Sequence, residues 1–427
     1  MTPSTPSIAS PLAVPRPWFW LGVGAVAMGL APWIFNAPFE QSVLTQIAIA
    51  MVACLSYNML WGQGGMLSFG HAVYTGLGAY MAMHVMQGLG DGGWGVPVSL
   101  IPLVGGVCGM GFAVVLGYVS TRKSGTTLAM ITLGLGELVF AMSLMFSDFF
   151  GGEAGLSGNR VHGADLWGID FKSPIQVYYL IGAYTWVSVA LMYAFTQTPL
   201  GRLLNAARDN AERLSFIGYQ PQRVRYLAFI ISGFFAGVSG GMAVLHFEMV
   251  TADVVGTARS GAYLLFTILG GSGYFVGPLL GAVGMVLSGV LLSEWTTAGL
   301  LYLGLLFMAM VMYAPGGLAS LGVWHLSWVT RTGAARLWPW YLGCLMSAGV
   351  AALGAASAIE LFYHRQWHSS VGQPLRWLGQ PWATDQPLPW VLAALALTAG
   401  LVGWMFCKRH WDRAWDQMAW VPNGANP

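Results

Sequence analysis

Charge is what this sequence lacks most. Only 8% of its 427 residues are Asp, Glu, Lys or Arg, whereas 56% are hydrophobic and the mean hydropathy is +0.62. A soluble globular protein carries about 25% charged residues, so this composition excludes that class and indicates a polytopic membrane protein. The net charge is +2 and the basic residues are scattered. We therefore expect no surface for nucleic acid.

Cysteine and catalytic signatures are also scarce. The four cysteines lie in apolar segments without metal-ligand spacing, at Cys54, Cys108, Cys344 and Cys407. This pattern predicts neither disulfides nor a metal site. A P-loop is missing, because Arg122 stands where residues 117–124 would need their second glycine. With no nucleophile–base constellation either, we expect a chain that is not an enzyme and holds no cofactor of its own.

Apolar segments fill most of the remaining chain. They lie at residues 18–35, 43–61, 72–87, 96–119, 125–147, 175–195, 226–247, 260–270, 276–293, 299–313, 338–358 and 388–407. They predict an all-α, polytopic transmembrane bundle of about 10–12 hydrophobic segments, some short or broken. Residues 1–16, rich in Pro and Ser, predict a disordered tail. If every segment crosses, most Lys and Arg lie on the side of both termini, which the positive-inside rule places in the cytoplasm.

Glycine is abundant, and its positions indicate both close helix packing and breaks in helices. Gly233, Gly237 and Gly241 recur every four residues, as do Gly105 and Gly109, which predicts close packing of neighbouring helices. Residues 62–65 and 270–273 are glycine clusters that each interrupt an apolar run. Broken helices at membrane depth survive only where protein or water satisfies the backbone, and in transporters such paired breaks flank the substrate path. The two clusters therefore hint at an internal repeat.

Four polar residues near the apolar runs are candidates for a substrate pathway. Gln63, Ser68 and His71 adjoin the first glycine cluster, where they either line a path or cap a broken helix. Glu137 stands alone in the segment 125–147, where an ionised carboxylate costs at least ~2.5–3.5 kcal/mol unless it is paired or faces a polar cavity. Structural pairing with a hydroxyl or backbone group on a neighbouring helix and a role in transport both remain open for Glu137.

The segment 198–226 is the polar exception in the chain. Thr198 as N-cap, Pro199 at the first position and Gly218 as C-cap predict one helix over 199–218. Asp209 and Arg213 have the spacing of a stabilising pair. An apolar face runs along one side, at Leu200, Leu203, Leu204, Ala207, Ala211 and Leu214. Such a helix lies across a surface. It is either a solvated connection between spans or a docking surface for a soluble partner.

Four stretches in order resemble the permeases of branched-chain amino acid ABC transporters, and most closely the second of their two permease subunits. They are LSYNMLWGQGGMLSFGH at 55–71, GGEAGLSG at 151–158, the loop 199–219 and residues 268–278. The resemblance covers about residues 40–318. It implies a permease domain at 17–320 in the bacterial inner membrane, a second permease, two ATP-binding subunits that bind the ATP, and a periplasmic solute-binding protein. By the same analogy the helix 199–218 couples to the ATPase, with contacts expected at Arg202, Arg208, Asp209, Glu212, Arg213 and Gly218.

Two points remain open at this stage. Residues 330–427 extend beyond the family pattern, with two further apolar segments and no function implied by the resemblance. Sister permeases that carry urea or short-chain amides share the same motifs, so the solute is a branched-chain amino acid or a related small polar molecule. The alternative function is a secondary transporter or channel in which Glu137 carries a coupling proton.

Overall fold

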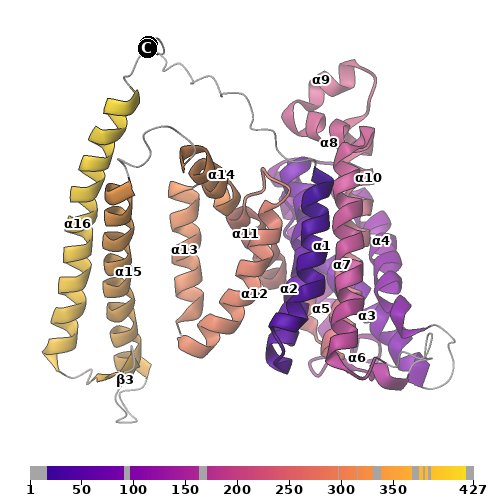
Figure 1. Ribbon diagram of the computed structural model, residues 1–427. Coiled ribbons are helices and arrows are strands. Elements are labelled where there is room, and N and C mark those ends of the chain that lie inside the picture. Colours follow the sequence, from indigo (N-terminus) through magenta and orange to yellow (C-terminus); the bar gives the residue numbers. More distant parts are fainter. Residues whose placement is uncertain are drawn as a thin grey trace. The chain divides into compact units, whose positions relative to one another are not determined.

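The computed structural model describes residues 17–90, 97–162, 171–296, 298–314, 316–329, 338–367, 375–377, 380–382 and 386–419 (Figure 1). The tail predicted at 1–16 lies outside these residues. The chain separates into two compact units, Met1–Gly289 with Ala309–Ser320 and Val290–Met308 with Leu321–Pro427. The second unit therefore takes in residues 290–308, which the sequence-based division assigned to 17–320.

Helices account for nearly all of the described secondary structure. The elements up to the second glycine cluster are α1 (Pro17–Ile34), α2 (Pro38–Asn58), η1 (Met59–Gln63), α3 (His71–Gly90), η2 (Val98–Leu100), α4 (Ile101–Ser120), α5 (Thr126–Met145), α6 (Ser147–Phe150), β1 (Leu156–Ser157), η3 (Arg160–His162), α7 (Pro174–Gln197), α8 (Pro199–Asp209), α9 (Ala211–Phe216), α10 (Pro221–Phe247), β2 (Met249–Val250), η4 (Ala252–Val254) and α11 (Thr257–Gly270). The later elements are α12 (Gly277–Trp295), α13 (Gly299–Tyr313), α14 (Gly317–Val329), α15 (Trp338–Trp367), β3 (Leu375–Trp377), β4 (Gln380–Trp382) and α16 (Pro387–Ala419).

Each of the predicted apolar segments coincides with a helix, which confirms the polytopic helical membrane fold. Within the described residues, seven helices are long and apolar enough to span a membrane, or eight if α13 and the start of α14 form one bent span. The other predicted segments form shorter helices, in agreement with the prediction that some segments are short or broken. The helix α11, for example, has 14 residues, fewer than the ~20 that a perpendicular span requires.

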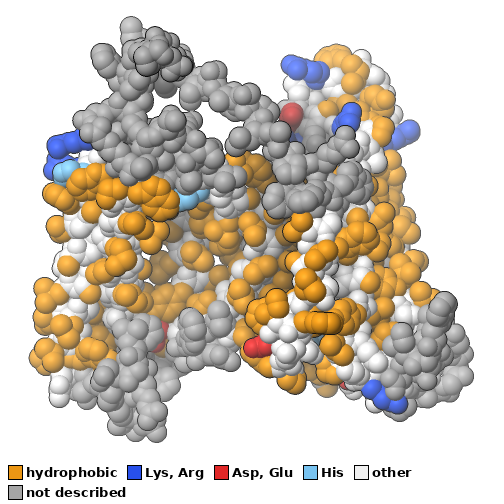
Figure 2. Space-filling model, in the orientation of Figure 1, with side chains coloured by type: hydrophobic (Ala, Val, Ile, Leu, Met, Phe, Trp, Pro, Cys, Tyr) orange, Lys and Arg blue, Asp and Glu red, His pale blue; other side chains and the backbone are white. Residues whose placement is uncertain are grey.

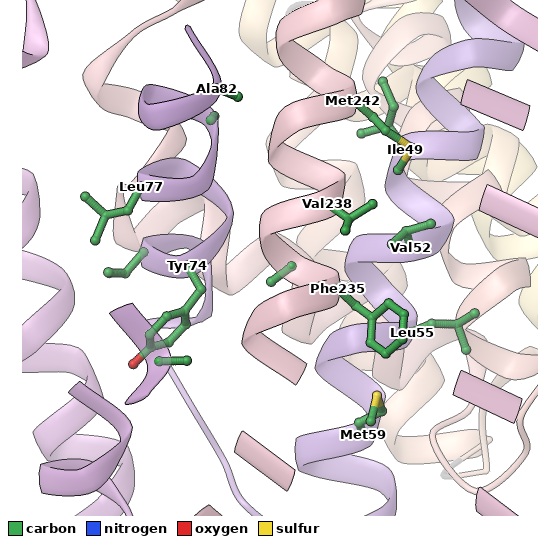
Figure 3. Packing of buried hydrophobic residues seen from close by; sticks show 14 of the residues in the cluster. Ile49, Val52, Leu55, Met59, Tyr74, Leu77, Ala82, Phe235, Val238 and Met242 are labelled. Atoms are coloured by element: carbon green, nitrogen blue, oxygen red, sulfur yellow. The ribbon is translucent and has the colours of Figure 1, made fainter. Parts of the chain in front are cut away.

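The helix α10 lies at the centre of the first unit. It packs against α4, α3 and α2. Figure 3 shows Phe235, Val238 and Met242 of α10 directed toward α2, where Val52 and Leu55 are buried. Burial of such side chains contributes roughly 1.5–3 kcal/mol each where water is the alternative. Inside a bilayer the tight fit itself supplies more of the stabilisation, because lipid tails are as apolar as the core.

The predicted glycine stripes meet between α4 and α10. A Cβ atom on Gly109 would lie 2.7 Å from the Gly233 carbonyl oxygen and 2.8 Å from the Gly237 Cα. A Cβ on Gly105 would lie 2.6 Å from the Gly237 carbonyl oxygen. The two backbones are therefore too close for any larger residue, which confirms the role in packing that the spacing predicts.

The end of α10 away from α8 is tied to the glycine-rich loop 151–158. Strand β1 pairs antiparallel with β2 in this region. Arg160 donates a hydrogen bond to the Leu245 carbonyl oxygen at 3.0 Å and forms an ion pair with Glu248 at 3.7 Å. The loop and the end of α10 are thus joined by backbone pairing and by charge.

The second unit contains the antiparallel helices α15 and α16. Their spans bury only 11% of their residues in the apolar window, so most of their side chains face outward, as expected for contact with lipid. Glu360 of α15 is an exception, with 6% exposure. Its Oε1 accepts a hydrogen bond from the Tyr302 hydroxyl at 3.0 Å and another from the Thr296 hydroxyl. These bonds fix α15 to the chain on either side of the start of α13.

Candidate functional site

The first glycine cluster breaks the membrane helix that begins with α2. The helix ends in the π-helical turn η1, and residues 64–70 are not helical before α3 begins. A π-turn spaces the backbone more widely than an α-turn and is frequent at functional sites. Gly65 adopts a φ of 61°, a conformation that favours glycine. The predicted interruption is therefore present, and its conformation depends on the glycine residues there.

The helix α8 closes over this break. The Arg208 guanidinium donates a hydrogen bond to the Gly62 carbonyl oxygen, and a Cβ on Gly65 would lie 2.7 Å from the Arg208 Cγ. On its other side, α8 receives a hydrogen bond from Arg225 of α10, whose Nη2 lies 3.3 Å from the Ala207 carbonyl oxygen. The helix α8 is thus bonded to both the broken helix and the central helix, and a displacement of α8 acts directly on both.

The helix predicted over 199–218 has the expected ends, but the prediction of one continuous helix is wrong. The Thr198 hydroxyl accepts a hydrogen bond from the Gly201 N–H at 3.3 Å, and Gly218 has a φ of 88°. Between them Asn210 leaves the helical conformation, with φ −157°, and its Oδ1 accepts from the Arg213 N–H at 2.9 Å. Asn is a strong N-cap residue, so its side chain ends α8 and starts α9.

The same break removes the predicted pair between Asp209 and Arg213. Asp209 pairs instead with its neighbour Arg208, with 3.0 Å between Oδ1 and Nε. Positions four apart face each other only within a continuous helix, and Asn210 interrupts it. Both side chains of the observed pair are exposed, so it contributes roughly 0–1 kcal/mol.

The predicted apolar face of α8 and α9 is buried at Leu204, Ala207 and Leu214. Arg202 and Arg213 are exposed on the opposite side. Figure 2 shows Lys and Arg side chains over α8 and α9, whereas hydrophobic side chains cover much of the surface of the helices next to them. The pair α8–α9 therefore offers a charged face beside an apolar bundle.

Sequence reasoning missed an apolar tip at the end of α9. Phe216 is 81% exposed and Ile217 is 65% exposed, and the next aromatic residue, Tyr219, is exposed too. Glu212 lies one turn before this tip and is also exposed. The sequence did contain a signal for this tip. The apolar residues come after Leu214, the last position of the predicted apolar face, and lie on both sides of the predicted C-cap Gly218. Exposed apolar side chains of this size on a polar loop are typical of a contact surface.

The two glycine-rich breaks meet beside α8. At the second break, Gly271 has a φ of 110°, and a Cβ on Gly62 would lie 2.5 Å from the Ser272 carbonyl oxygen. A cavity of about 450 Å³, here called the junction cavity, lies between η1, the end of α7, α8 and residues 272–275. Asn58 and Gln63 line it, and the Asn58 Oδ1 and Gln63 Oε1 atoms are buried without a hydrogen-bond partner in the described part of the chain.

Ser68 and His71 lie deeper than Gln63. Both are fully buried, and the His71 Nε2 lies 2.8 Å from the Ser56 Oγ. Neither is among the residues that line the junction cavity or the second cavity described below. The Ser56 contact favours the interpretation that His71 supports the broken helix, whereas the Ser68 Oγ is buried without a hydrogen-bond partner in the described part of the chain.

The loop before α3 is held by α5 and α11. The Phe69 N–H donates to the Thr132 Oγ1 at 3.1 Å, and the Ala72 N–H donates to the Ser260 Oγ at 3.0 Å. Hydroxyl groups of neighbouring helices thus satisfy the backbone that the break sets free, as burial away from water requires. These contacts also bring the start of α3 close to the start of α11.

A second cavity, here called the α5–α11 cavity, lies between α5, η4 and the first turn of α11. Its volume is about 500 Å³ and Glu137 lines it. Glu137 is exposed near the middle of α5, and its Oε1 accepts a hydrogen bond from the Thr257 hydroxyl at 2.9 Å. An exposed carboxylate in a membrane span costs ~2.5–3.5 kcal/mol against lipid. This face of α5 is therefore suited to protein or water and not to lipid.

The structure does not bring the four predicted pathway residues together. Gln63 lines the junction cavity and Glu137 lines the α5–α11 cavity, whereas Ser68 and His71 are buried between helices. Two further charged residues of the α5–α11 cavity, Asp253 and Arg259, were not singled out in the sequence. Both lie close to the apolar segment 260–270 and had no local pattern to mark them.

Comparisons with known proteins place these features in a family. A family model described as the permease component of branched-chain amino acid transport systems matches residues 41–315. The high-affinity branched-chain amino acid transport system permease protein LivM of Salmonella typhimurium is 27% identical over 300 residues, which cover 65% of this chain and 69% of LivM. LivM of Escherichia coli is 26% identical over 299 residues, with the same coverage of each chain.

A more distant relative is the probable branched-chain amino acid transport permease protein LivH of Methanocaldococcus jannaschii. It is 24% identical over 276 residues, which cover 61% of this chain and 84% of LivH. No solved structure matches the chain. The family match contains both glycine-rich breaks, α8 and both cavities, and it ends before α15. Because it covers well over half of the residues, the chain belongs to the family of branched-chain amino acid transport permease components.

Proposed function

We propose that this chain is one of two permease subunits of an ATP-binding-cassette importer in a bacterial inner membrane. The complete importer takes up branched-chain amino acids or related small polar solutes. It also contains a second permease, two ATP-binding subunits and a periplasmic solute-binding protein. Family membership and the printed names of the relatives support this assignment. In this proposal the chain itself is not an enzyme, and ATP is hydrolysed by its partners.

The hydrogen bond between Arg208 and the Gly62 carbonyl is the observation that carries the mechanism. In our proposal, the ATP-binding subunits move α8 and α9 when they bind and hydrolyse ATP. Arg208 passes that movement to η1, where the two glycine-rich breaks enclose the junction cavity. Rigid-body movement of this kind alternates access when two packed arrangements are available. We also propose that α8, α9 and both chain termini are in the cytoplasm, which the positive-inside distribution of Lys and Arg supports.

The contact with the ATP-binding subunit involves charge and an apolar anchor. Arg202, Glu212 and Arg213 supply exposed charges, whereas Asp209 and Arg208 are already paired with each other. Phe216 and Ile217 extend beyond these charges, and Gly218 gives the chain the turn that presents them. Interfaces commonly bind through a few buried aromatic and aliphatic anchors inside a polar rim.

The test is uptake of labelled leucine, isoleucine and valine by proteoliposomes that contain the complete importer. The double variant Arg202→Glu with Arg213→Glu should abolish ATP-driven uptake while the protein remains in the membrane. Lys123→Glu is the matched control, because this exposed residue lies outside α8 and α9. Unchanged uptake by the double variant would refute the coupling role.

A second assay separates the rival function, a proton-coupled carrier or channel based on Glu137. The proton gradient is collapsed while ATP is held constant. An ATP-driven importer continues to accumulate solute under these conditions, whereas a proton-coupled carrier stops. Uptake by the purified chain alone, without nucleotide or partner subunits, would also overturn the proposal.

A further inference from the structure

The α5–α11 cavity combines both signs of charge with apolar walls. Glu137 and Asp253 provide the carboxylates, and Arg259 provides the guanidinium. Phe140 and Val254 contribute apolar surface to the same cavity. A volume of about 500 Å³ is within the range of small-molecule sites, which are mostly apolar with a few placed polar groups.

The groups of the cavity with positive charge or positive partial charge are Arg259 and the N–H groups in the first turn of α11. The N-cap is Gly256, which has no side chain that could cap the helix. The N–H groups of Thr257, Ala258 and Arg259 have no acceptor within the helix, and all three residues line the cavity. The Arg259 guanidinium interacts with Tyr263 and has five N–H donors to offer. Helix N-termini and arginine together favour a carboxylate.

The negatively charged groups of the cavity are Glu137 and Asp253. Glu137 receives the hydrogen bond from Thr257, and an ionised carboxylate can accept about four hydrogen bonds in all. Asp253 in η4 is exposed at the same cavity. Two carboxylates with spare acceptor sites favour a ligand that carries an ammonium group.

We propose that this cavity binds the zwitterionic group of an α-amino acid. Its carboxylate is held by the first turn of α11 and Arg259, and its ammonium by Glu137 and Asp253. An aliphatic side chain then lies against Phe140 and Val254. The inference rests on the proposed function, because it assigns to the permease a transient binding site for the imported solute. It also selects amino acids over urea and short-chain amides without an amino group, which lack both charges.

Binding is measured without the periplasmic solute-binding protein, whose own selectivity would mask that of the permease. The importer is placed in nanodiscs with its ATP-binding subunits and titrated by saturation-transfer NMR. The probes are L-leucine, leucinamide, which lacks the carboxylate, and 4-methylpentanoate, which lacks the ammonium. L-leucine should bind about tenfold or more tightly than either analogue, because hydrogen bonds between charged groups contribute strongly.

Two variants test the residues. Glu137→Gln and Arg259→Gln should each weaken L-leucine binding about tenfold or more, while Glu153→Gln, an exposed acid that does not line the cavity, leaves it unchanged. Thermal unfolding shows whether each variant is folded. The comparison of L-leucine with its two analogues uses the unaltered importer, so it tests the inference even if a variant does not fold. Equal binding of the three probes, or binding by both folded variants like that of the unaltered importer, overturns the inference. Failure of ATP-driven uptake by the unaltered importer overturns the proposed function instead.

Discussion

Glu137 and Glu360 both lie within long apolar helices, and their surroundings differ. Glu137 is exposed at a cavity and receives one hydrogen bond, from Thr257, in the described structure. Glu360 is 6% exposed and receives hydrogen bonds from Tyr302 and Thr296. A carboxylate that is buried and satisfied by its neighbours is typical of a structural link. One that keeps spare acceptor sites in a cavity is typical of a binding site.

The two glutamates also differ in where they lie relative to the family. Glu137 is inside the matched residues 41–315, whereas Glu360 belongs to the extension beyond them. The hydroxyl partners of Glu360 come from residues 290–308, the part of the chain that joins α15 and α16 in one compact unit. We infer that Glu360 attaches the extension to the last helices of the permease, whereas Glu137 serves transport. Variants can separate these two roles.

The largest difference between variants of Glu137 and Glu360 is expected in the rate of solute uptake. Glu137→Ala is expected to lower ATP-driven leucine uptake about tenfold or more, because a charged partner of the solute is lost. Glu360→Ala should leave uptake per folded molecule nearly unchanged. The measurement is the initial uptake rate of labelled leucine in proteoliposomes, normalised to the amount of folded importer. Equal losses in the two variants would contradict the division of roles.

The free energy of unfolding should fall more in the Glu360 variant than in the Glu137 variant, the opposite of the order expected for uptake. Glu360→Ala removes the charged acceptor of the half-buried Tyr302 and Thr296 hydroxyls, which costs about 1–3 kcal/mol of the free energy of unfolding, although the Tyr302 hydroxyl keeps the Ala356 carbonyl oxygen at 3.2 Å. Glu137→Ala removes an exposed side chain and should change that free energy by about 0.5 kcal/mol or less. Denaturant titration of the purified chain in one detergent measures both. A larger loss for Glu137→Ala would mean that Glu137 is the structural residue.

A smaller loss is expected when one donor to Glu360 is removed. Tyr302→Phe deletes the hydroxyl that donates at 3.0 Å and keeps the aromatic ring in place. The carboxylate retains its bond from Thr296, so the free energy of unfolding should fall by about 0.5–1.5 kcal/mol. Tyr313→Phe is a matched control, because this tyrosine is 75% exposed. If the two variants have the same stability, the Tyr302 hydroxyl does not support Glu360.

The sequence predicted the helices well because the signals for them are local. Long apolar runs, the N-cap Thr198 and the C-cap Gly218 each depend on neighbouring residues only. The stripes that contain Gly109 and Gly237 were also predicted, since four-residue spacing places small residues on one face. Asn210 was missed because two local tendencies compete there. Its capping side chain prevails over the helical periodicity around it.

The candidate site was predicted only in part because it depends on contacts between distant segments. Glu137 attracted notice as a lone charge in an apolar run, but Arg259 and Asp253 join it only when α11 folds back against α5. Glu360 was missed for a related reason. The apolar segment 338–358 ends just before it by hydropathy, whereas α15 continues to Trp367. Its pairing with Tyr302 connects positions far apart in sequence.

The smallest effect is expected for an acid that lies in water. Asp209 forms an exposed ion pair with Arg208, so Asp209→Asn should change the free energy of unfolding by roughly 0–1 kcal/mol. The change should shrink further in high salt, because exposed charges are screened, whereas the loss from Glu360→Ala should persist. Denaturant titrations at low and high salt measure this contrast. A loss for Asp209→Asn as large as that for Glu360→Ala would show that the environment of a carboxylate does not set its contribution in this protein.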